Sequence, residues 1–475
     1  MLDKRQFYIN GQWVNPAVQN DLEVINPSNE EPYAVISLGG QADTDAAVAA
    51  ARAAFPAWSQ TSKKERLELL KKLLEAYNAR AEEMAQAMSQ EMGAPIDWAR
   101  SAQVGAGSWH LQGFIEALPD FEFEYQYAKD EHHILEPIGV AGLITPWNWP
   151  MNQVVLKVGA AVAAGCTMVL KPSEIAPMSS LLFAEMMDAA GFPAGVFNLV
   201  NGDGPGVGTQ LSTHPDVDMI SFTGSTRAGI LITKTAAPTM KRVTTELGGK
   251  GANIIFADAP EKAVKIGAIK CFNNSGQSCN APTRMLVHRS RYDAAVEQAA
   301  AQAEATAVGP ASIEGKHIGP VVSEVQFRKI QGLIEKGIAE GARLVAGGPG
   351  RPKGLNRGYF VRPTVFADVS NDMTIAQTEI FGPVLSIIPF ETEEEAIRIA
   401  NDTVYGLTNY VQSADADLCK RAARQLKSGM VETNYRSFAQ GSPFGGVRQS
   451  GSGREGGKFG IEDFLVLKAI SGWDE

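Results

Sequence analysis

The sequence contains few of the residues that bind structural metals or form disulfide bonds. It has four cysteines and six histidines in 475 residues, with no C-x-x-C, H-x3-H or H-E-x-x-H spacing. A zinc site or a disulfide-stapled scaffold therefore has no support in the sequence, and we expect no metal. The cysteines are widely spaced, which favours a reduced, cytoplasmic protein; they are Cys166, Cys271, Cys279 and Cys419.

Long hydrophobic runs and clusters of basic residues are also missing. The chain opens with MLDKRQFYIN, which has no apolar signal-peptide core, and the most apolar stretch, Val154–Leu170, is interrupted by Lys157. Lys and Arg total 43 against 53 Asp and Glu, a net charge of −10, and no basic run has the density of a nucleic-acid patch. We therefore expect neither a membrane nor nucleic acid as a partner.

The composition that is present, 44% hydrophobic and 20% charged residues, is typical of soluble globular proteins. A chain of 475 residues predicts two or three domains. The first hundred residues combine strand-like runs at Gln6–Ile9 and Glu23–Ile25 with helical patterns over Asp43–Ala57 and Lys63–Glu91. Apolar and polar residues then alternate over Phe121–Leu135, which predicts an antiparallel hairpin.

From Gly139 the chain repeats a strand, a turn and a helix. Short apolar strands that alternate with helices predict a parallel, doubly wound α/β sheet, and a second α/β set extends from about Lys250 to Asn434. A final strand is expected at Phe464–Ser471, and Ala346–Gly354 is expected to be a surface loop. Ligands of such sheets bind at the carboxyl ends of the strands, so the turns that follow the strands are the expected place for a site.

Three polar segments carry side chains suited to nucleophilic catalysis. Cys279 lies among small polar residues in NNSGQSCNAPTR, directly after a helical run, and is either a nucleophile or a buried structural thiol. Glu246 ends a strand in TTELGGK and is either a base or a solvated carboxylate. Asn148, between two indoles and two prolines in PWNWP, is either an oxyanion donor or an Asn that satisfies its own turn.

Other turns have features that suit a nucleotide. Asn201–Gly208 and Phe222–Gly229 are Gly-rich, follow a strand and open a helix, where backbone N–H groups and the helix dipole suit a phosphate. Neither matches G-x-G-x-x-G or a Walker A loop, and each is equally compatible with a plain βα turn. Lys171 and Glu174 offer a cation and a carboxylate to a ribose, or form a surface salt bridge.

Together these motifs resemble the NAD(P)-dependent aldehyde dehydrogenase superfamily. PWNWP, LKPSE, FTGST, ELGGK, GQSC, EIFGPV, YGLT and PFGGVRQSGSGREGG occur in the family's order and spacing, from about residue 140 to 460. The resemblance implies two doubly wound, Rossmann-like α/β domains: an NAD-binding domain (1–117 and 138–248) and a catalytic domain (249–450). It also implies a small β bridging element (118–137 and 462–475) and a homodimer or homotetramer.

The resemblance further implies a role for each motif residue. Cys279 would be the nucleophile, Glu246 the general base, and Asn148 an oxyanion donor beside the backbone N–H of Cys279. NAD is the expected cofactor, with NADP used less well, because Glu174 would meet the adenosine ribose. The residues expected to contact the cofactor are Ile144, Thr145, Pro146, Trp147, Lys171, Ser173, Glu174, Gly204, Gly208, Phe222, Thr223, Gly224, Ser225, Leu247, Glu379 and Phe381.

These roles imply an enzyme that oxidises an aldehyde to the carboxylic acid with NAD+, through a cysteine thiohemiacetal and a thioester. A CoA-acylating dehydrogenase is an alternative, but that branch generally lacks a Glu at the position of Glu246. A non-redox thiol hydrolase would not need LKPSE, FTGST and EIFGP together. A non-catalytic relative would tolerate loss of Cys279 or Glu246, and both are present.

The expected substrate pocket includes residues from the same motifs and from the loop 435–441, which is one residue shorter than the family pattern. Its expected residues are Trp149, Gln153, Ser278 and Asn280, together with Tyr435, Arg436 and Phe438 of the loop. The polar Asn152 and Gln153, with Arg436 nearby, favour a polar or carboxylate-bearing aldehyde.

Overall fold

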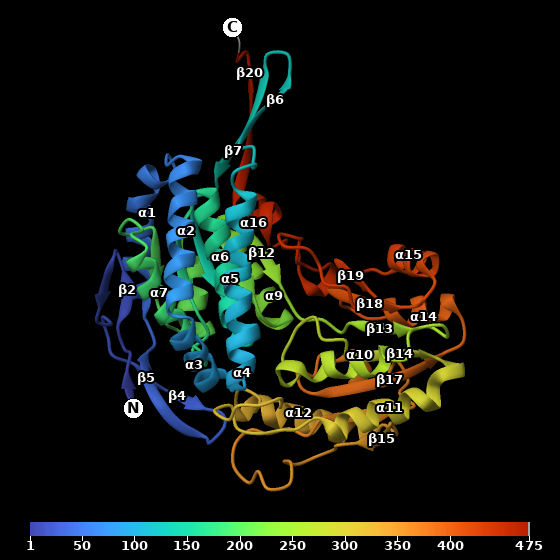
Figure 1. Ribbon diagram of the computed structural model, residues 1–475. Helices are drawn as coiled ribbons and strands as arrows, with labels where there is room; N and C mark the ends of the chain where they lie inside the picture. The colour runs from blue at the N-terminus through green and yellow to red at the C-terminus, as the bar shows by residue number, and fades with distance from the viewer. Residues whose placement is uncertain (474–475) are drawn as a thin grey trace.

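The computed structural model describes residues 1–473 and contains two large, helix-covered sheets that form two lobes (Figure 1). In the first sheet, the five strands from β12 to β10 run parallel, and β2 and β3 add an antiparallel edge. Its spatial order is β12 (Arg242–Glu246), β11 (Met219–Thr223), β8 (Val140–Ile144), β9 (Thr167–Lys171), β10 (Phe197–Leu199), β2 (Phe7–Ile9) and β3 (Gln12–Val14).

The second sheet is parallel apart from its edge strand β15, which pairs antiparallel with β16. Its spatial order is β15 (Arg343–Ala346), β16 (Thr364–Ala367), β17 (Val384–Phe390), β14 (Arg284–His288), β13 (Ala252–Ile255), β18 (Thr408–Gln412) and β19 (Met430–Thr433). Its helices are α10 (Ala263–Phe272), α11 (Tyr292–Ala305), α12 (Glu324–Ala339), α13 (Thr374–Gln377), α14 (Glu393–Asn401) and α15 (Ala416–Gln425). The predicted α/β class with two parallel-rich sheets is confirmed.

Alternate residues of the first sheet face different helix layers, as the two-residue period of a strand requires. Val140 and Ile144 of β8 pack with α1 (Gln41–Trp58), α8 (Thr209–Thr213) and α9 (Thr226–Ala236). Leu143, between them, faces the other layer, where α6 (Pro150–Ala164) and α7 (Met178–Ala189) lie on the sheet and α2 (Lys63–Ala79) and α5 (Val104–Ala117) pack on them.

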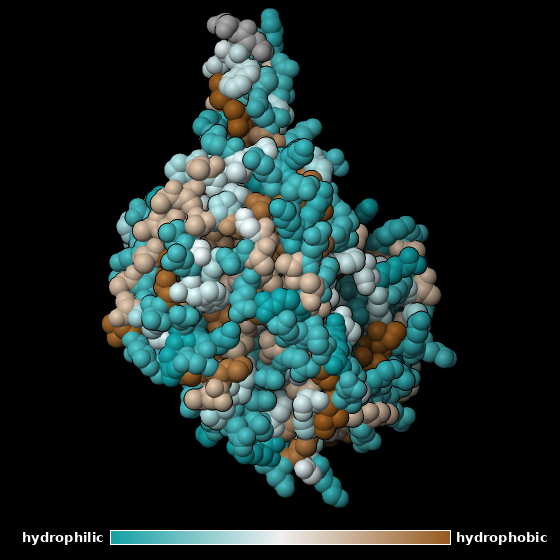
Figure 2. Space-filling view, turned by 60° about the vertical axis from the view of Figure 1, so that its left-hand side comes forward, coloured by the Kyte–Doolittle hydropathy of each residue, from teal (hydrophilic) through white to brown (hydrophobic). Residues whose placement is uncertain are grey.

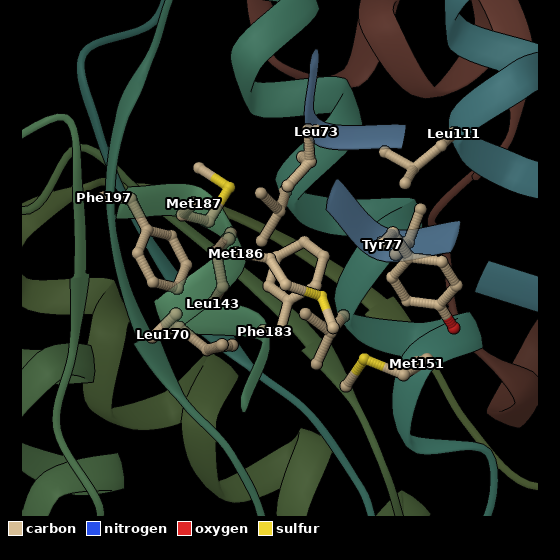
Figure 3. Close-up of a cluster of buried hydrophobic side chains, with 14 of the residues drawn as sticks. Leu73, Tyr77, Leu111, Leu143, Met151, Leu170, Phe183, Met186, Met187 and Phe197 are labelled. Atoms are coloured by element: carbon tan, nitrogen blue, oxygen red, sulfur yellow. The ribbon is translucent and has the colours of Figure 1, made fainter. Parts of the chain in front are cut away.

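Figure 3 shows the cluster that this second layer buries. Phe183, Met186 and Met187 of α7 meet Leu143, Leu170 and Phe197 of the strands, and Leu73, Tyr77, Leu111 and Met151 continue it outward into α2, α5 and α6. These side chains are almost completely removed from water, and burial of each contributes about 2 kcal/mol of hydrophobic stabilisation. The cluster fixes α6, whose first turn follows the PWNWP segment, against the sheet.

The single helix predicted over Lys63–Glu91 is wrong at one position. The chain forms α2 and then α3 (Ala81–Met92), because Arg80 leaves the helical conformation at φ −114° and ψ 24°. Its guanidinium pairs with Glu83 and with Glu185 of α7, so this break is tied to the neighbouring helix.

A three-stranded sheet projects from the top of the first lobe (Figure 1). It contains the predicted hairpin, β6 (Glu124–Ala128) and β7 (Glu131–Pro137), and the predicted final strand, β20 (Leu465–Ser471). β20 pairs antiparallel with β7 of its own chain along seven residue pairs, so β6 and β20 are the outer strands. A smaller sheet near the N-terminus has the order β1 (Leu2–Asp3), β5 (Glu31–Ser37) and β4 (Asp21–Asn26).

Two further observations concern residues 1–473 as a whole. None of their helices combines the length and the apolar character needed to cross a membrane. They also contain no group of three or more His, Cys, Asp or Glu side chains placed to hold a metal ion.

Candidate active site

A pocket of about 220 Å³ lies where turns that follow β8, β11 and β12 meet the segment around Cys279. Such an edge of a parallel sheet is the expected position for a ligand. The predicted site residues that line it are Pro146, Trp147, Asn148, Thr223, Gly224, Ser225, Leu247, Cys279, Glu379 and Phe381. Gly248, Gln326 and Lys329, which the sequence analysis missed, line it too, as does Gln153, an expected substrate residue.

Cys279 follows α10 and a short left-handed turn, and it is partly exposed. Asn274, Ser275 and Gly276 of that turn have φ of 54°, 57° and 73°. A Cβ added at Gly249 would stand 2.5 Å from the carbonyl oxygen of Cys279, so the ELGGK glycine permits this close approach. Burial raises the pKa of the Cys279 thiol, and the carboxylates of Glu379 and Glu246 raise it further. The thiol is therefore protonated at neutral pH and needs a base to become a nucleophile.

Asn148 is buried in the loop between β8 and α6. Its Nδ2 donates a hydrogen bond to the Gln277 carbonyl at 3.0 Å, two residues before Cys279. The neighbouring indole of Trp149 donates to Ser278 Oγ at 2.8 Å. These contacts hold the amide next to the cysteine segment, where an oxyanion donor has to be.

Glu246 is the last residue of β12, and only 3% of its surface is exposed, so it is not a solvated strand-end carboxylate. Neither carboxylate oxygen has a hydrogen-bond partner within residues 1–473. Burial raises the pKa of Glu246 well above its ordinary value; the carboxylate of Glu455 raises it further, while Lys157 and Arg454 oppose the shift. A carboxyl group with a raised pKa suits general-base catalysis near neutral pH.

Lys157 and Glu455 form a buried ion pair beside this carboxylate, and the sequence analysis missed both. Lys157 Nζ also donates to Thr223 Oγ1 at 2.7 Å, which ties α6 to the end of β11. The available signal was the single cation in the apolar stretch Val154–Leu170, which the sequence analysis treated only as an interruption of a membrane span. A lysine on a buried helix face needs a partner.

A second cluster lies at the ends of β9 and β10. The Lys171 ammonium donates to the carbonyls of Pro172 and Gly202 at 2.8 and 2.7 Å and lies 3.5 Å from a carboxylate oxygen of Glu174. Burial lowers the pKa of Lys171, and the charge of Glu174 opposes that shift. The Glu174 side chain is 30% exposed and that of Lys171 only 4%, so the carboxylate is the part of this pair that is open to a ligand.

The remaining predicted cofactor residues lie near one of these two places. Thr145 donates its backbone N–H to the Lys171 carbonyl at 3.2 Å, and a Cβ added at Gly208 would stand 3.8 Å from the Lys171 side chain. Ser173 Oγ accepts from the backbone N–H of Ile175 at 3.3 Å. Ile144, Phe222 and Gly204 lie at the end of β8, within β11 and at the start of the turn before α8. Only backbone position supports a ligand role for these three.

The structure places some of the expected substrate residues in the pocket and others away from it. Gln153 is buried in the pocket, whereas Tyr435 packs against α10, where its hydroxyl donates to the Ala263 carbonyl at 2.6 Å. Asn152 Oδ1 pairs with His110 Nε2 at 2.7 Å, and Arg436 is exposed. Gln153 is therefore the expected polar residue that lines the pocket beside Cys279.

Comparisons with known proteins agree with this geometry. A model described as the aldehyde dehydrogenase family matches residues 13–470. A 3-succinoylsemialdehyde-pyridine dehydrogenase from a Pseudomonas species is 51% identical over the full length of both chains. The crystal structure of a Bartonella henselae aldehyde dehydrogenase is 59% identical, with a TM-score of 0.98 and coverage of 99% of this chain and 100% of that one.

A further solved structure contains ligands. It is a cysteine-to-alanine mutant of Pseudomonas syringae aldehyde dehydrogenase C in complex with NAD+ and octanal, 49% identical, with a TM-score of 0.98 and coverage of 99% and 97%. Family model, sequence identity and fold lead to one assignment. The chain belongs to the aldehyde dehydrogenase family.

Proposed function

We propose that this enzyme oxidises an aldehyde to the carboxylic acid with NAD+ through covalent intermediates on Cys279. The observation that carries the proposal is the placement of Cys279 and the Asn148 amide in one pocket, with the buried Glu246 carboxylate close enough to raise the pKa of the thiol. A nucleophile, an oxyanion donor and a base are the groups that acyl transfer through a thiol requires.

The residues present fit NAD. Glu174 and Lys171 suit the adenosine ribose, and Ser225, which caps the N-terminus of α9, suits the pyrophosphate. Glu379 suits the second ribose, beside the perpendicular rings of Trp147 and Phe381, whose centroids are 5.4 Å apart. The NAD+ complex of the Pseudomonas syringae relative supports this assignment.

We also propose the domain division that the motifs imply. The first sheet and its helices, residues 1–117 and 138–248, would bind NAD, and residues 249–450 would supply the nucleophile. The pocket is lined by residues of both parts, so a nicotinamide held by the first would lie beside the nucleophile of the second. NAD+, when bound, supplies the acceptor for the hydride that leaves the substrate carbon.

In the first half-reaction, Cys279 loses its proton to a base and its sulfur bonds to the aldehyde carbon. The carbonyl oxygen becomes an oxyanion, which Asn148 Nδ2 and the backbone N–H of Cys279 stabilise. Loss of hydride from the same carbon re-forms the C=O bond and leaves a thioester on Cys279. The substrate carbon has then been oxidised by two electrons.

In the second half-reaction, Glu246 accepts a proton from water, whose oxygen attacks the thioester carbon. The C–S bond breaks, the acid leaves, and Cys279 is restored. The positive charges of Lys157 and Arg454 favour the ionised form of Glu246, whereas burial and the carboxylate of Glu455 oppose it. Overall, aldehyde, NAD+ and water give the carboxylic acid, NADH and a proton.

A panel of aliphatic, aromatic and ω-carboxylated aldehydes, followed by NADH absorbance, tests this function. NADH formation that needs no CoA is the expected result. Strict dependence on CoA would favour the CoA-acylating alternative, and ester turnover with no NADH from any aldehyde would favour a thiol hydrolase.

Because Gln153 places an amide in the pocket, we propose that polar aldehydes are preferred over aliphatic ones of equal length.

Cofactor choice gives a prediction that depends on Glu174. Its carboxylate can accept hydrogen bonds from the ribose hydroxyls of NAD but repels the 2′-phosphate of NADP. The Lys171 ammonium, 3.5 Å from the Glu174 carboxylate, offsets part of that repulsion, so the discrimination should be incomplete. We expect kcat/KM to favour NAD by about ten-fold or more, and Glu174→Gln to narrow the gap chiefly by improving NADP use. Equal kcat/KM for the two cofactors in the wild type would contradict this account.

The projecting sheet gives a prediction about assembly. Figure 2 shows hydrophobic residues on its surface, and Tyr127, Leu467 and Trp473 are 66%, 58% and 44% exposed. Outer strands and exposed apolar side chains of this kind are usually covered by a partner. We propose that residues 118–137 and 462–475 join subunits into a homodimer or homotetramer; residues 474–475 lie outside the described chain. Sedimentation of a stable 50.8 kDa monomer at micromolar concentration would contradict this.

A further inference from the structure

The helical run Ile96–Ala117 changes to π-helical hydrogen bonding over η1 (Ala99–Gln103). Such a bulge rotates the residues that follow it and is frequent at functional sites. Gln103 is the last residue of the bulge, and its side chain is fully buried. The bulge therefore marks the position from which Gln103 enters the interior.

The Gln103 amide joins two parts of the proposed active site that are far apart in the sequence. Its Nε2 donates to the backbone carbonyl of Asn148 at 3.2 Å and to Asn274 Oδ1 at 3.1 Å. Asn148 carries the proposed oxyanion donor, and Asn274 begins the left-handed turn that leads to Cys279. One NH2 group thus bridges the donor loop and the nucleophile segment.

Further hydrogen bonds make this bridge part of a closed network. Asn274 Nδ2 donates to the Asn148 carbonyl at 3.0 Å and to the Gln277 carbonyl at 3.2 Å. Asn148 Nδ2 donates to the same Gln277 carbonyl at 3.0 Å. The turn at Asn274 has a positive φ, which non-glycine residues adopt only when their surroundings hold them there. Gln103 orients the Asn274 side chain that closes this network.

The oxygen of the Gln103 amide does not contribute to the stability of the fold. Gln103 Oε1 is buried and has no hydrogen-bond partner within residues 1–473. A buried, unpartnered acceptor is unfavourable for folding, and a methionine of similar size would avoid that cost. The two hydrogen bonds from Nε2 are therefore the feature that distinguishes Gln103 from an apolar residue of the same volume.

We propose that Gln103 is a positioning residue, which fixes the Asn148 loop and the turn before Cys279 so that Asn148 Nδ2 meets the oxyanion. This inference rests on the proposed function, because it acts through the role given to Asn148. It concerns the chemical step and not the binding of NAD, since both hydrogen bonds that Gln103 makes within residues 1–473 go to Asn148 and Asn274.

A double-mutant cycle tests the proposal. Gln103→Met keeps the volume and removes both donors. We expect the rate of the NADH burst to fall about ten-fold, a fraction of the 10²- to 10³-fold effect of losing an oxyanion donor. The KM for NAD should stay within error of the wild type. The melting temperature should fall only modestly, because the variant leaves Asn274 Oδ1 without its donor but also removes the unpartnered Gln103 Oε1. In the Asn148→Ala background, Gln103→Met should lower the burst rate less than two-fold further, because the group that it positions is already gone.

The matched control is Gln412→Met, which removes another buried amide. Within residues 1–473 its Nε2 donates one hydrogen bond, to Asn253 Oδ1 at 3.0 Å in the second sheet. The burst rate of Gln412→Met should not change.

Equal ten-fold losses of burst rate for Gln103→Met in the wild-type and Asn148→Ala backgrounds would overturn the inference while leaving the proposed function intact. A wild-type burst rate in Asn148→Ala alone would remove Asn148 as the oxyanion donor and overturn the inference with it, whereas loss of NADH formation in the wild type would overturn the proposed function itself.

A second variant covers the case in which Gln103→Met does not fold. Gln103→Glu keeps the shape, but its ionised carboxylate would face the oxygens of Asn148 and Asn274. Only its protonated form can donate a hydrogen bond to one of them, so we expect its burst rate, divided by that of the wild type, to rise as the pH falls. A ratio that is independent of pH would contradict a positioning role.

Discussion

Replacing Cys279 with alanine is expected to lower aldehyde oxidation by at least about 1,000-fold, equivalent to about 4 kcal/mol of barrier. The reason is chemical, because no other thiol lines the pocket within residues 1–473 and the thioester cannot form without one. Affinity for NAD should change little, since the proposed ribose contacts come from Glu174 and Glu379. The measurements are NADH formation for turnover and protein fluorescence for NAD binding.

The matched control for this variant is Cys419→Ala. Cys419 is buried on α15, where its thiol contacts the Ser413 carbonyl at 3.7 Å, and it belongs to no part of the pocket. Its replacement should reduce stability modestly and leave turnover in place. Retention of even a tenth of the wild-type rate in Cys279→Ala, only about 1.4 kcal/mol of barrier, would remove Cys279 from the chemistry.

Glu246→Gln is expected to separate the two half-reactions. The amide cannot accept a proton from water, so steady-state turnover should fall by at least about 100-fold. Cys279 can still be acylated, so a burst of at most one NADH per active site should form before the reaction stops at the thioester. A smaller burst would show that Glu246 also deprotonates the thiol. Glu246→Asp, which keeps a carboxylate, should retain more turnover than the Gln variant. Unchanged steady-state turnover in Glu246→Gln would exclude Glu246 as the base.

The same residue predicts a pH dependence. Burial and Glu455 raise the pKa of Glu246, and a protonated carboxyl group cannot act as the base. Where hydrolysis limits the rate, kcat should therefore rise with pH through this raised pKa and fall as the carboxyl group is protonated. This rise of kcat with pH should be absent in Glu246→Gln. A pH profile of kcat that is the same in both proteins would assign the titration to another group.

The pocket residues could be predicted because parallel strands bring their carboxyl ends to one edge. Asn148 and Thr223 follow or end such strands and line the pocket, and Glu246 ends β12 close by. The strand ends predicted where a site would lie, and the family resemblance assigned the roles of these residues. The break at Arg80 could not be predicted in this way, because no Gly or Pro marks it and one partner of Arg80, Glu185, lies far away in the sequence. Helical periodicity alone continues through such a position.

Contacts between segments that are far apart in the sequence explain the other residues that the sequence analysis missed or misplaced. Lys157 and Glu455 are 298 residues apart, and their pairing is a property of how α6 meets the C-terminal loop. Tyr435 lies in the loop expected to line the pocket, yet a left-handed backbone at φ 55° accompanies its packing against α10. Gln103 belongs to none of the motifs, and its contact with Asn148 from the end of a π-helical turn joins segments 45 residues apart.

The most direct test of the account is the mass of the enzyme trapped between the two half-reactions. Glu246→Gln, mixed with NAD+ and a reactive aldehyde and quenched in acid within the burst, should gain the mass of one acyl group in place of one hydrogen, and peptide mapping should place it on the peptide that contains Cys279. One NADH should form for each acyl group, and Cys279→Ala should show neither. An NADH burst without an acyl adduct, or an adduct on any other residue, would contradict the proposed mechanism.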